Sequence, residues 1–234
     1  LNPDSRLSVA FGVHDKALHV HPGFTVSAPL INPEIALGEV EHEYMSKEHR
    51  VVVIDDFFSD HALKELHDFL LESTIWSDGK VGYVGAYLES GFACPLVAQI
   101  DEALRAGFSQ VLKGLTLRDA WAYMYDGSRG GITAHADDAQ VQINFFVTPT
   151  EANLWRNGSD DPSGGLVVYG VGPLPGWDGL RYNSVRVNPK ILKIIADSGH
   201  HNITVPYVRN RAVLFDSTYF HATDRMKFKP GYKN

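Results

Sequence analysis

From about residue 116 onward, the chain consists of short β-rich runs separated by glycine, proline and asparagine. The runs are DAWAYMYD, AQVQINFFVT, GGLVVYG, HNITVPY and RAVLFD. Short strands with long irregular connections are typical of packed antiparallel sheets rather than of an alternating α/β sheet. This feature constrains the fold most. It predicts a mainly β domain, a sandwich or jelly roll, with flanking α-helices.

The first half of the chain predicts those flanking helices. The β-branched tract 50–58 is typical of a strand, and Ser59 or Asp60 can cap the helix that follows it. Pro95 in the first turn and Gly114 at the end bound a second predicted helix.

The domain organisation follows from length and composition. A chain of 234 residues is long enough for one large domain that folds without disulfides. Residues 1–49 are rich in proline, histidine and glutamate with weak periodicity, so we expect an extended N-terminal arm over a domain at 50–234. Within the arm, His19 and His21 have a metal-like spacing, but no third ligand follows at a useful distance, which favours a surface loop.

The sequence lacks an initial methionine and stops after KPGYKN, so we expect a piece of a longer protein whose domain is incomplete at its C-terminus.

The charge and the cysteine content limit the binding partners and the cellular compartment that the sequence is compatible with. The formal net charge is -7, and no cluster of basic residues is present, so we expect no nucleic-acid surface. No apolar run approaches the roughly 18 residues of a membrane span, and the N-terminus does not have the pattern of a signal peptide. Cys94 is the only cysteine, which excludes an internal disulfide and predicts a small buried side chain. We therefore expect a cytoplasmic protein without a membrane partner; its oligomeric state stays open.

A candidate metal site lies in the stretch HADDAQVQINFFVTP, which begins at His135. Residues i and i+2 of a strand point to one face, so His135 and Asp137 can converge there, and His221 follows another predicted strand. Two imidazoles and a carboxylate form the facial triad typical of non-haem Fe(II), whereas structural zinc sites prefer four ligands, usually with thiolates. Spacing alone leaves open a second interpretation, in which both histidines make ordinary hydrogen bonds.

The flanking strands carry side chains suited to a polar pocket. Period-2 alternation places Trp121, Tyr123 and Tyr125 on one face of the strand before His135. In VQINFFVTP, the amides of Gln142 and Asn144 share a face, and buried amides are costly unless they bond something. A bound polar ligand would explain them.

Four segments together resemble the 2-oxoglutarate- and Fe(II)-dependent oxygenases, close to the prolyl-4-hydroxylase-like group. They are VVVIDDFFSD followed by a helix, YMYDGSRGGITAHAD, GGLVVYG, and NRAVLFDSTYFHATDR. They cover roughly residues 50–234 in the order typical of the family. The resemblance implies a double-stranded β-helix (jelly-roll, cupin-like) core and an enzyme that uses Fe(II), 2-oxoglutarate and O2.

The resemblance also implies roles for single residues. His135, Asp137 and His221 would be the iron ligands. Tyr125 matches a tyrosine that donates a hydrogen bond to 2-oxoglutarate, and Asn144 lies where the family lines the cosubstrate pocket.

The basic residue that anchors the far carboxylate of 2-oxoglutarate in this family has no clear match. Arg225 and Lys233 are the candidates within the chain, and we expect the anchor to lie beyond Asn234. Asp138 and Asp216 are candidates for fixing the imidazoles.

The implied reaction is hydroxylation of an unactivated C–H bond, with release of succinate and CO2. Relatives that halogenate replace the carboxylate ligand, and Asp137 keeps that position filled. A protein or peptidyl substrate, prolyl among them, and an amino-acid-like small molecule both fit. Residues 79–92 and 170–183 have the glycine, tyrosine and tryptophan content of a mobile lid, with plain surface loops as the alternative. An insertion at 171–201 overlaps the second segment and contains the helix-like PKILKIIADSG. The alternatives are a cupin-type metalloenzyme without 2-oxoglutarate and a non-catalytic metal-binding module.

Overall fold

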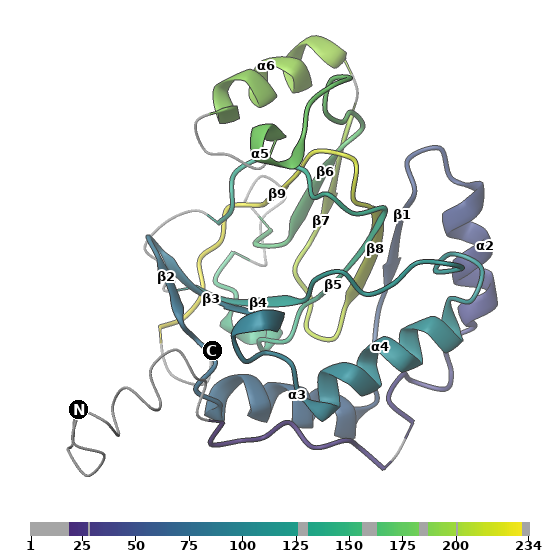
Figure 1. Ribbon diagram of the computed structural model, residues 1–234, viewed down its shortest axis with the longest axis vertical. Coiled ribbons are helices and arrows are strands. Elements are labelled where there is room, and N and C mark those ends of the chain that lie inside the picture. Colours follow the sequence, from purple (N-terminus) through teal and green to yellow (C-terminus); the bar gives the residue numbers. More distant parts are fainter. Residues whose placement is uncertain are drawn as a thin grey trace, which may run out of the picture.

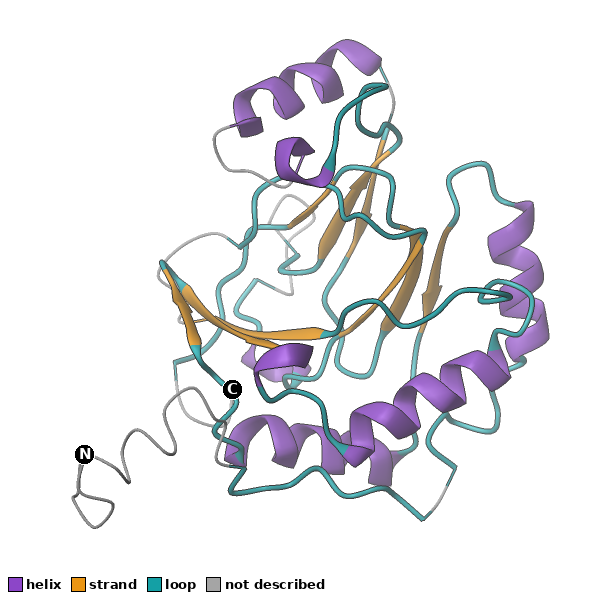
Figure 2. Cartoon of the chain, viewed as in Figure 1, coloured by secondary structure: helices purple, strands orange, loops and turns teal. Residues whose placement is uncertain are grey.

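The computed structural model describes residues 19–27, 29–125, 131–155, 163–182, 187–199 and 201–230. Within them, strands lie at the centre and helices lie around them (Figures 1 and 2). The helices are α2 (Leu37–Ser46), α3 (Asp60–Glu72), α4 (Pro95–Gly107), α5 (Gly179–Tyr182) and α6 (Asn188–Ser198). The strands are β1 (Val51–Ile54), β2 (Asp78–Lys80), β3 (Tyr83–Tyr87), β4 (Trp121–Tyr125), β5 (Val141–Phe145), β6 (Leu166–Tyr169), β7 (Asn202–Val205), β8 (Ala212–Asp216) and β9 (His221–Thr223). The predicted class, mainly β with flanking helices, is confirmed.

The strands form three small antiparallel sheets, ordered β1-β8-β5, β7-β6-β9 and β2-β3-β4. In the first sheet, β8 lies in the middle, where Leu214 pairs with Val52 on one side and Ile143 on the other. The runs of valine and isoleucine suit these strands, because β-branched side chains pack well on a pleated surface.

The first two sheets pack face to face. Alternate residues of the first sheet, among them Val213 and Phe215, share a buried cluster with Leu166 and Val168 of β6. His221 pairs directly with Val168, so its side chain also points between the sheets. Its ring lies edge-on to Phe215, with 5.1 Å between ring centroids.

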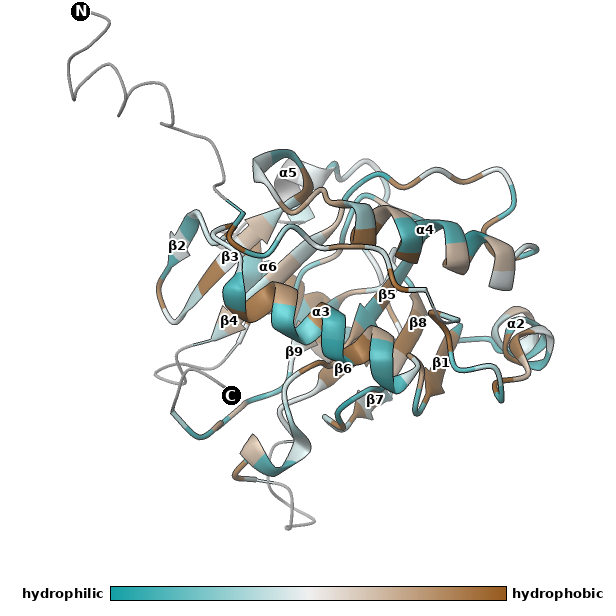
Figure 3. Ribbon diagram, turned by 90° about the horizontal axis from the view of Figure 1, so that it is seen from below, coloured by the Kyte–Doolittle hydropathy of each residue, from teal (hydrophilic) through white to brown (hydrophobic). Residues whose placement is uncertain are grey.

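The other face of the first sheet packs against α3 and α4. Ala212 and Leu214 share the largest apolar cluster with Leu66 and Phe69 of α3 and Leu96 of α4. Ser59 caps α3 by accepting a hydrogen bond from the Ala62 N–H, as the sequence predicted. Figure 3 shows hydrophobic and hydrophilic patches alternating along α3, which is the pattern of a helix with one buried side.

The prediction of an extended arm at 1–49 is wrong for residues 37–46, which form α2. Residues 1–18 lie outside the described part of the chain. Within α2, Val40 and Tyr44 are four residues apart, and Tyr44 is buried in the main cluster. Val40 packs against that cluster, so a weak helical period was present but was hidden by the surrounding charged residues.

The second predicted helix ends earlier than expected, at Gly107 rather than near Gly114. The chain leaves the helical conformation at Phe108, which is fully buried. The carboxylate of Glu41 then accepts hydrogen bonds from the N–H groups of Gln110 (2.7 Å) and Val111 (2.9 Å). This long-range contact from α2 satisfies N–H groups of the turn after α4, and it has no local sequence signal.

The segment 79–92, for which a mobile lid and a plain surface loop were both open, contains β3 and part of β2. The strand β3 pairs with β4 along its whole length, from Tyr83 opposite Tyr125 to Tyr87 opposite Trp121. By contrast, the predicted helix in the insertion at 171–201 is present as α6. Among the described residues, no helix has the length and apolar character that crossing a membrane requires.

Candidate metal centre

Backbone pairing brings together His135, Asp137 and His221, here called the metal triad. His135 and His221 exchange both backbone hydrogen bonds, at 3.0 and 2.8 Å. Residues that exchange both bonds lie directly opposite each other with side chains on the same face, and Asp137, two residues on, shares that face. The predicted convergence of these three residues is therefore present in the structure, where β9 begins at His221.

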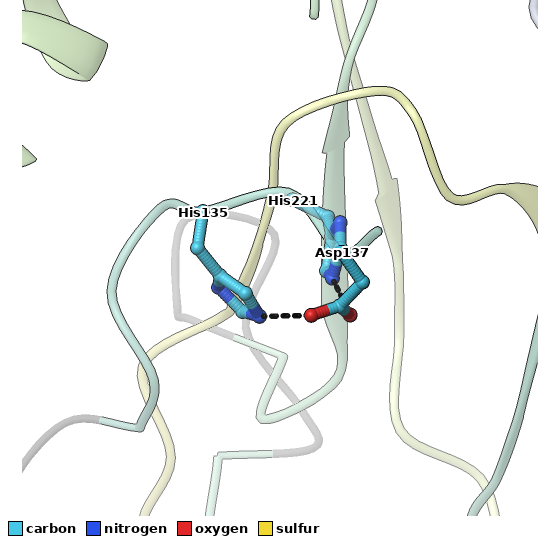
Figure 4. Close-up of side chains that lie close together, drawn as sticks. All are labelled: His135, Asp137 and His221. Atoms are coloured by element: carbon cyan, nitrogen blue, oxygen red, sulfur yellow. Dashed lines mark ion pairs between the residues drawn. The ribbon is translucent and has the colours of Figure 1, made fainter. Parts of the chain in front are cut away.

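The side-chain atoms of the metal triad lie close enough to share one ion (Figure 4). One potential ligand atom from each residue lies within 4.8 Å of the others. The two Asp137 carboxylate oxygens face the Nε2 atoms, at 3.9 Å from His135 and 3.2 Å from His221. The ring centroids of the two histidines are 4.4 Å apart.

Both imidazoles are oriented by main-chain carbonyls. Nδ1 of His135 lies 2.8 Å from the Thr133 carbonyl oxygen, and Nδ1 of His221 lies 3.0 Å from the Tyr219 carbonyl oxygen. In each case the carbonyl belongs to the residue two positions earlier. An Nδ1–H that donates to a carbonyl leaves Nε2 with a lone pair, which is the form that binds metal.

Burial favours the neutral form of His135. Its pKa is lowered to about 4, first because the ring is removed from water and second because of the charge that a protonated His221 would carry. A proton therefore competes poorly for this nitrogen near neutral pH. The arrangement suits metal binding, because ligands must be deprotonated.

The residues fit a divalent metal on the chemistry of their donors. Nε2 of His221 is buried and makes no hydrogen bond within the described part of the chain. A buried ring nitrogen left in that state costs free energy, and a bound cation would remove that cost. Two imidazoles with one carboxylate on one side are the donor set expected for non-haem Fe(II).

The backbone near Asp137 connects to the amides of β5. The Asp137 N–H donates to the Ser217 carbonyl at 3.4 Å, and the Ser217 hydroxyl donates to Gln142 Oε1, also at 3.4 Å. Gln142 in turn donates to Asn144 Oδ1 at 3.0 Å. Gln142 pairs opposite Phe215 and Asn144 opposite Val213, so both amides face the space between the two sheets. These contacts link Asn144 to the backbone of Asp137 by way of Gln142 and Ser217.

Tyr125 approaches the metal triad from the third sheet. Its hydroxyl lies 3.5 Å from Oγ1 of Thr223, which is two residues after His221 in β9. Burial raises the pKa of Tyr125 to about 12, so the phenol keeps its proton and can donate it in a hydrogen bond. Sequence reasoning had missed Thr223; its i+2 spacing from His221 was the available signal.

The structure gives the remaining sequence candidates other partners. The guanidinium of Arg225 lies 6.0 Å from the centre of the Trp155 ring, in a cation–π position, and its side chain is exposed. Lys233 lies outside the described residues. Asp138 forms an ion pair with Arg118 at 2.8 Å, and Asp216 accepts a hydrogen bond from the Thr218 hydroxyl at 2.6 Å. The imidazoles are bonded by carbonyls rather than by these two acids.

We refer to three residues as the cosubstrate candidates: Tyr125, Asn144 and Arg225.

No protein-family model matches the chain, and a search of curated proteins finds no relative. The comparisons therefore assign no family.

Proposed function

We propose that this protein is an Fe(II)- and 2-oxoglutarate-dependent dioxygenase. It hydroxylates an unactivated C–H bond of a protein, peptidyl or amino-acid-like substrate. The observation that carries the proposal is the metal triad: two imidazole Nε2 atoms and a carboxylate, largely buried and oriented by backbone contacts. When bound, Fe(II) with 2-oxoglutarate supplies the activation of O2, and succinate and CO2 are released.

The proposed core is a double-stranded β-helix. Two features support it: two antiparallel sheets pack face to face, and the bridge between His135 and His221 extends the second sheet beyond β9. This would place the iron ligands at one end of the space between the sheets.

Each residue has a specific role in this proposal. His135, Asp137 and His221 hold the metal through Nε2 and carboxylate oxygens. Tyr125 donates a hydrogen bond from its protonated phenol to the cosubstrate, and Asn144 lines the cosubstrate pocket from β5. Phe215 packs against the His221 ring and excludes water from that side of the site.

The test is anaerobic titration of the Fe(II)-loaded protein with 2-oxoglutarate. The expected result is a weak visible charge-transfer band that appears on addition of 2-oxoglutarate and is absent in His221→Ala. Fe(II) binding without this band would favour a cupin-type metalloenzyme that does not use 2-oxoglutarate. Survival of the band in His221→Ala would disprove the assignment.

A further inference from the structure

The back of the segment that carries the metal ligands packs against the insertion that contains α5 and α6. Ala134 and Ala136 alternate with His135 and Asp137, so their side chains point to the opposite face. Phe220 and Ala222 flank His221 in the same way. All four are buried, and they share one apolar cluster whose other buried members are Tyr182 of α5 and Ile191 of α6. The insertion, which lies at the top of Figure 1, therefore forms the wall behind the ligands.

Two hydrogen bonds join the insertion to the ligand segment. The side-chain amide of Asn188, the first residue of α6, donates to the Ala134 carbonyl at 2.8 Å. The Tyr182 carbonyl accepts a longer bond, at 3.4 Å, from the Ala136 N–H. Both bonds end on residues directly next to a metal ligand.

The Asn188 bond acts on one particular peptide group. The Ala134 carbonyl and the His135 N–H belong to the same planar unit. Asn188 bonds the oxygen of this unit, and the His135 N–H at the other end of the unit donates to the His221 carbonyl at 3.0 Å. Because both ends of the plane are held, the direction in which the His135 side chain leaves the backbone is fixed.

We propose that Asn188 is a positioning residue of the metal centre: from α6, it sets the backbone orientation of His135 and so the geometry in which His135 binds metal. This inference rests on the metal site of the proposed function. It adds a residue that the sequence pattern alone did not single out, in an insertion outside the sheets.

The position of Asn188 offers a substitution that separates metal binding from helix stability. Asparagine to aspartate keeps the size of the side chain but replaces the N–H donor by a second acceptor, which faces the Ala134 carbonyl unfavourably. At the first position of a helix, however, a negative charge is favourable. The charge offsets part of the stability that is lost with the hydrogen bond to Ala134, so Asn188→Asp should lower the stability less than Asn188→Ala does, while both weaken metal binding.

The experiment is a titration of the metal-free full chain with Co(II), followed by its visible d–d absorption. Asn188→Ala and Asn188→Asp should each weaken Co(II) binding by about 10- to 100-fold, the range typical for loss of a group that orients a ligand. The d–d bands should also shift, since the ligand field changes. Denaturant unfolding of the metal-free proteins should show Asn188→Asp more stable than Asn188→Ala.

Lys190→Gln is the matched control. Lys190 is exposed in the same turn of α6, and the change lowers the net charge by one unit, as Asn188→Asp does. Its Co(II) affinity should stay within about 2-fold of wild type, since simple charge changes at exposed sites are weak. Wild-type affinity and an unshifted spectrum in Asn188→Asp would overturn the positioning role alone. A wild-type protein that binds no Co(II) would overturn the metal site itself and the inference with it.

Discussion

The metal triad and the cosubstrate candidates are held in different ways. The triad is fixed by main-chain contacts: paired backbone bonds place the histidines opposite each other, and a carbonyl two residues earlier orients each ring. The cosubstrate candidates depend on side-chain contacts, such as the 3.5 Å approach of Tyr125 to Thr223 between two sheets and the bond from Gln142 to Asn144 within β5. Arg225 points to Trp155.

This difference indicates what fixes the positions of the side chains in the site. A backbone ladder positions side chains through the period of the strand, and here the side chain of Asn188 acts on that ladder through the Ala134 carbonyl. A contact between side chains of two different sheets depends on how those sheets pack. We therefore expect substitutions in the triad to have large effects and substitutions among the cosubstrate candidates to have smaller ones.

The largest effect should come from His221→Ala. It removes a ligand that is only 2% exposed, and we expect Fe(II) or Co(II) affinity to fall by more than about 100-fold, beyond the range for loss of an outer partner. Metal titration monitored by absorbance or calorimetry measures this. His61→Ala, an exposed histidine on α3, is the control and should bind as wild type does. A metal affinity in His221→Ala equal to that of wild type would show that the metal triad is no more sensitive to substitution than the cosubstrate candidates.

The second prediction concerns pH and the metal-free protein. The pKa of His135 is lowered from 6.5 to about 4 by burial, so the folded state holds this ring neutral. Its contribution to stability is complete above pH 6.5 and is lost as the pH falls toward 4, because the unfolded chain takes up the proton first. The full effect is about 3 kcal/mol at most.

Denaturant unfolding at several pH values between 7.5 and 4 checks this. Comparison with His135→Gln isolates the histidine from other groups that titrate in the same range. The stability of the variant should depend less on pH than that of wild type. Parallel curves for the two proteins would show that the ring is not desolvated as the structure indicates.

Tyr125→Phe should have a moderate effect. Loss of one hydrogen bond to the cosubstrate is expected to raise the Kd for 2-oxoglutarate about 5-fold, or about 1 kcal/mol, with metal affinity unchanged. Because burial raises the pKa of Tyr125 to about 12, the effect should be constant between roughly pH 6 and 9. Tyr87→Phe is a suitable control, since its hydroxyl donates to Asp78 instead. An unchanged Kd in Tyr125→Phe would remove Tyr125 from the cosubstrate site.

The smallest effect should come from Arg225→Ala. Its guanidinium lies over Trp155 on an exposed part of the chain, so we expect less than about a 2-fold change in the Kd for 2-oxoglutarate. Isothermal titration of the metal-loaded protein measures this. A loss of 10-fold or more would show that Arg225 leaves Trp155 and binds the cosubstrate.

The sequence predicted what depends on strand period. The H-x-D triplet and the strand before His221 indicated a metal site but left ordinary hydrogen bonds open as an alternative, and the family resemblance strengthened the expectation of the metal triad. The elements β1, α3 and α6 follow from local patterns. Contacts between elements distant in sequence were not predictable. The bond from the Gln110 N–H to Glu41 and the bond from Asn188 to Ala134 have no local signal, because each joins elements far apart along the chain.

The pairing of His135 with His221 has a consequence for folding. The two residues are far apart along the chain and meet only when β9 has docked, so an ion bound by both would act as a reversible cross-link closing a long loop. Ligands that bind only the folded state stabilise it by mass action, by about 2.7 kcal/mol at 100 times Kd. The melting temperature should therefore rise with free metal concentration. Loss of the ion should weaken the docking of both segments at the same time.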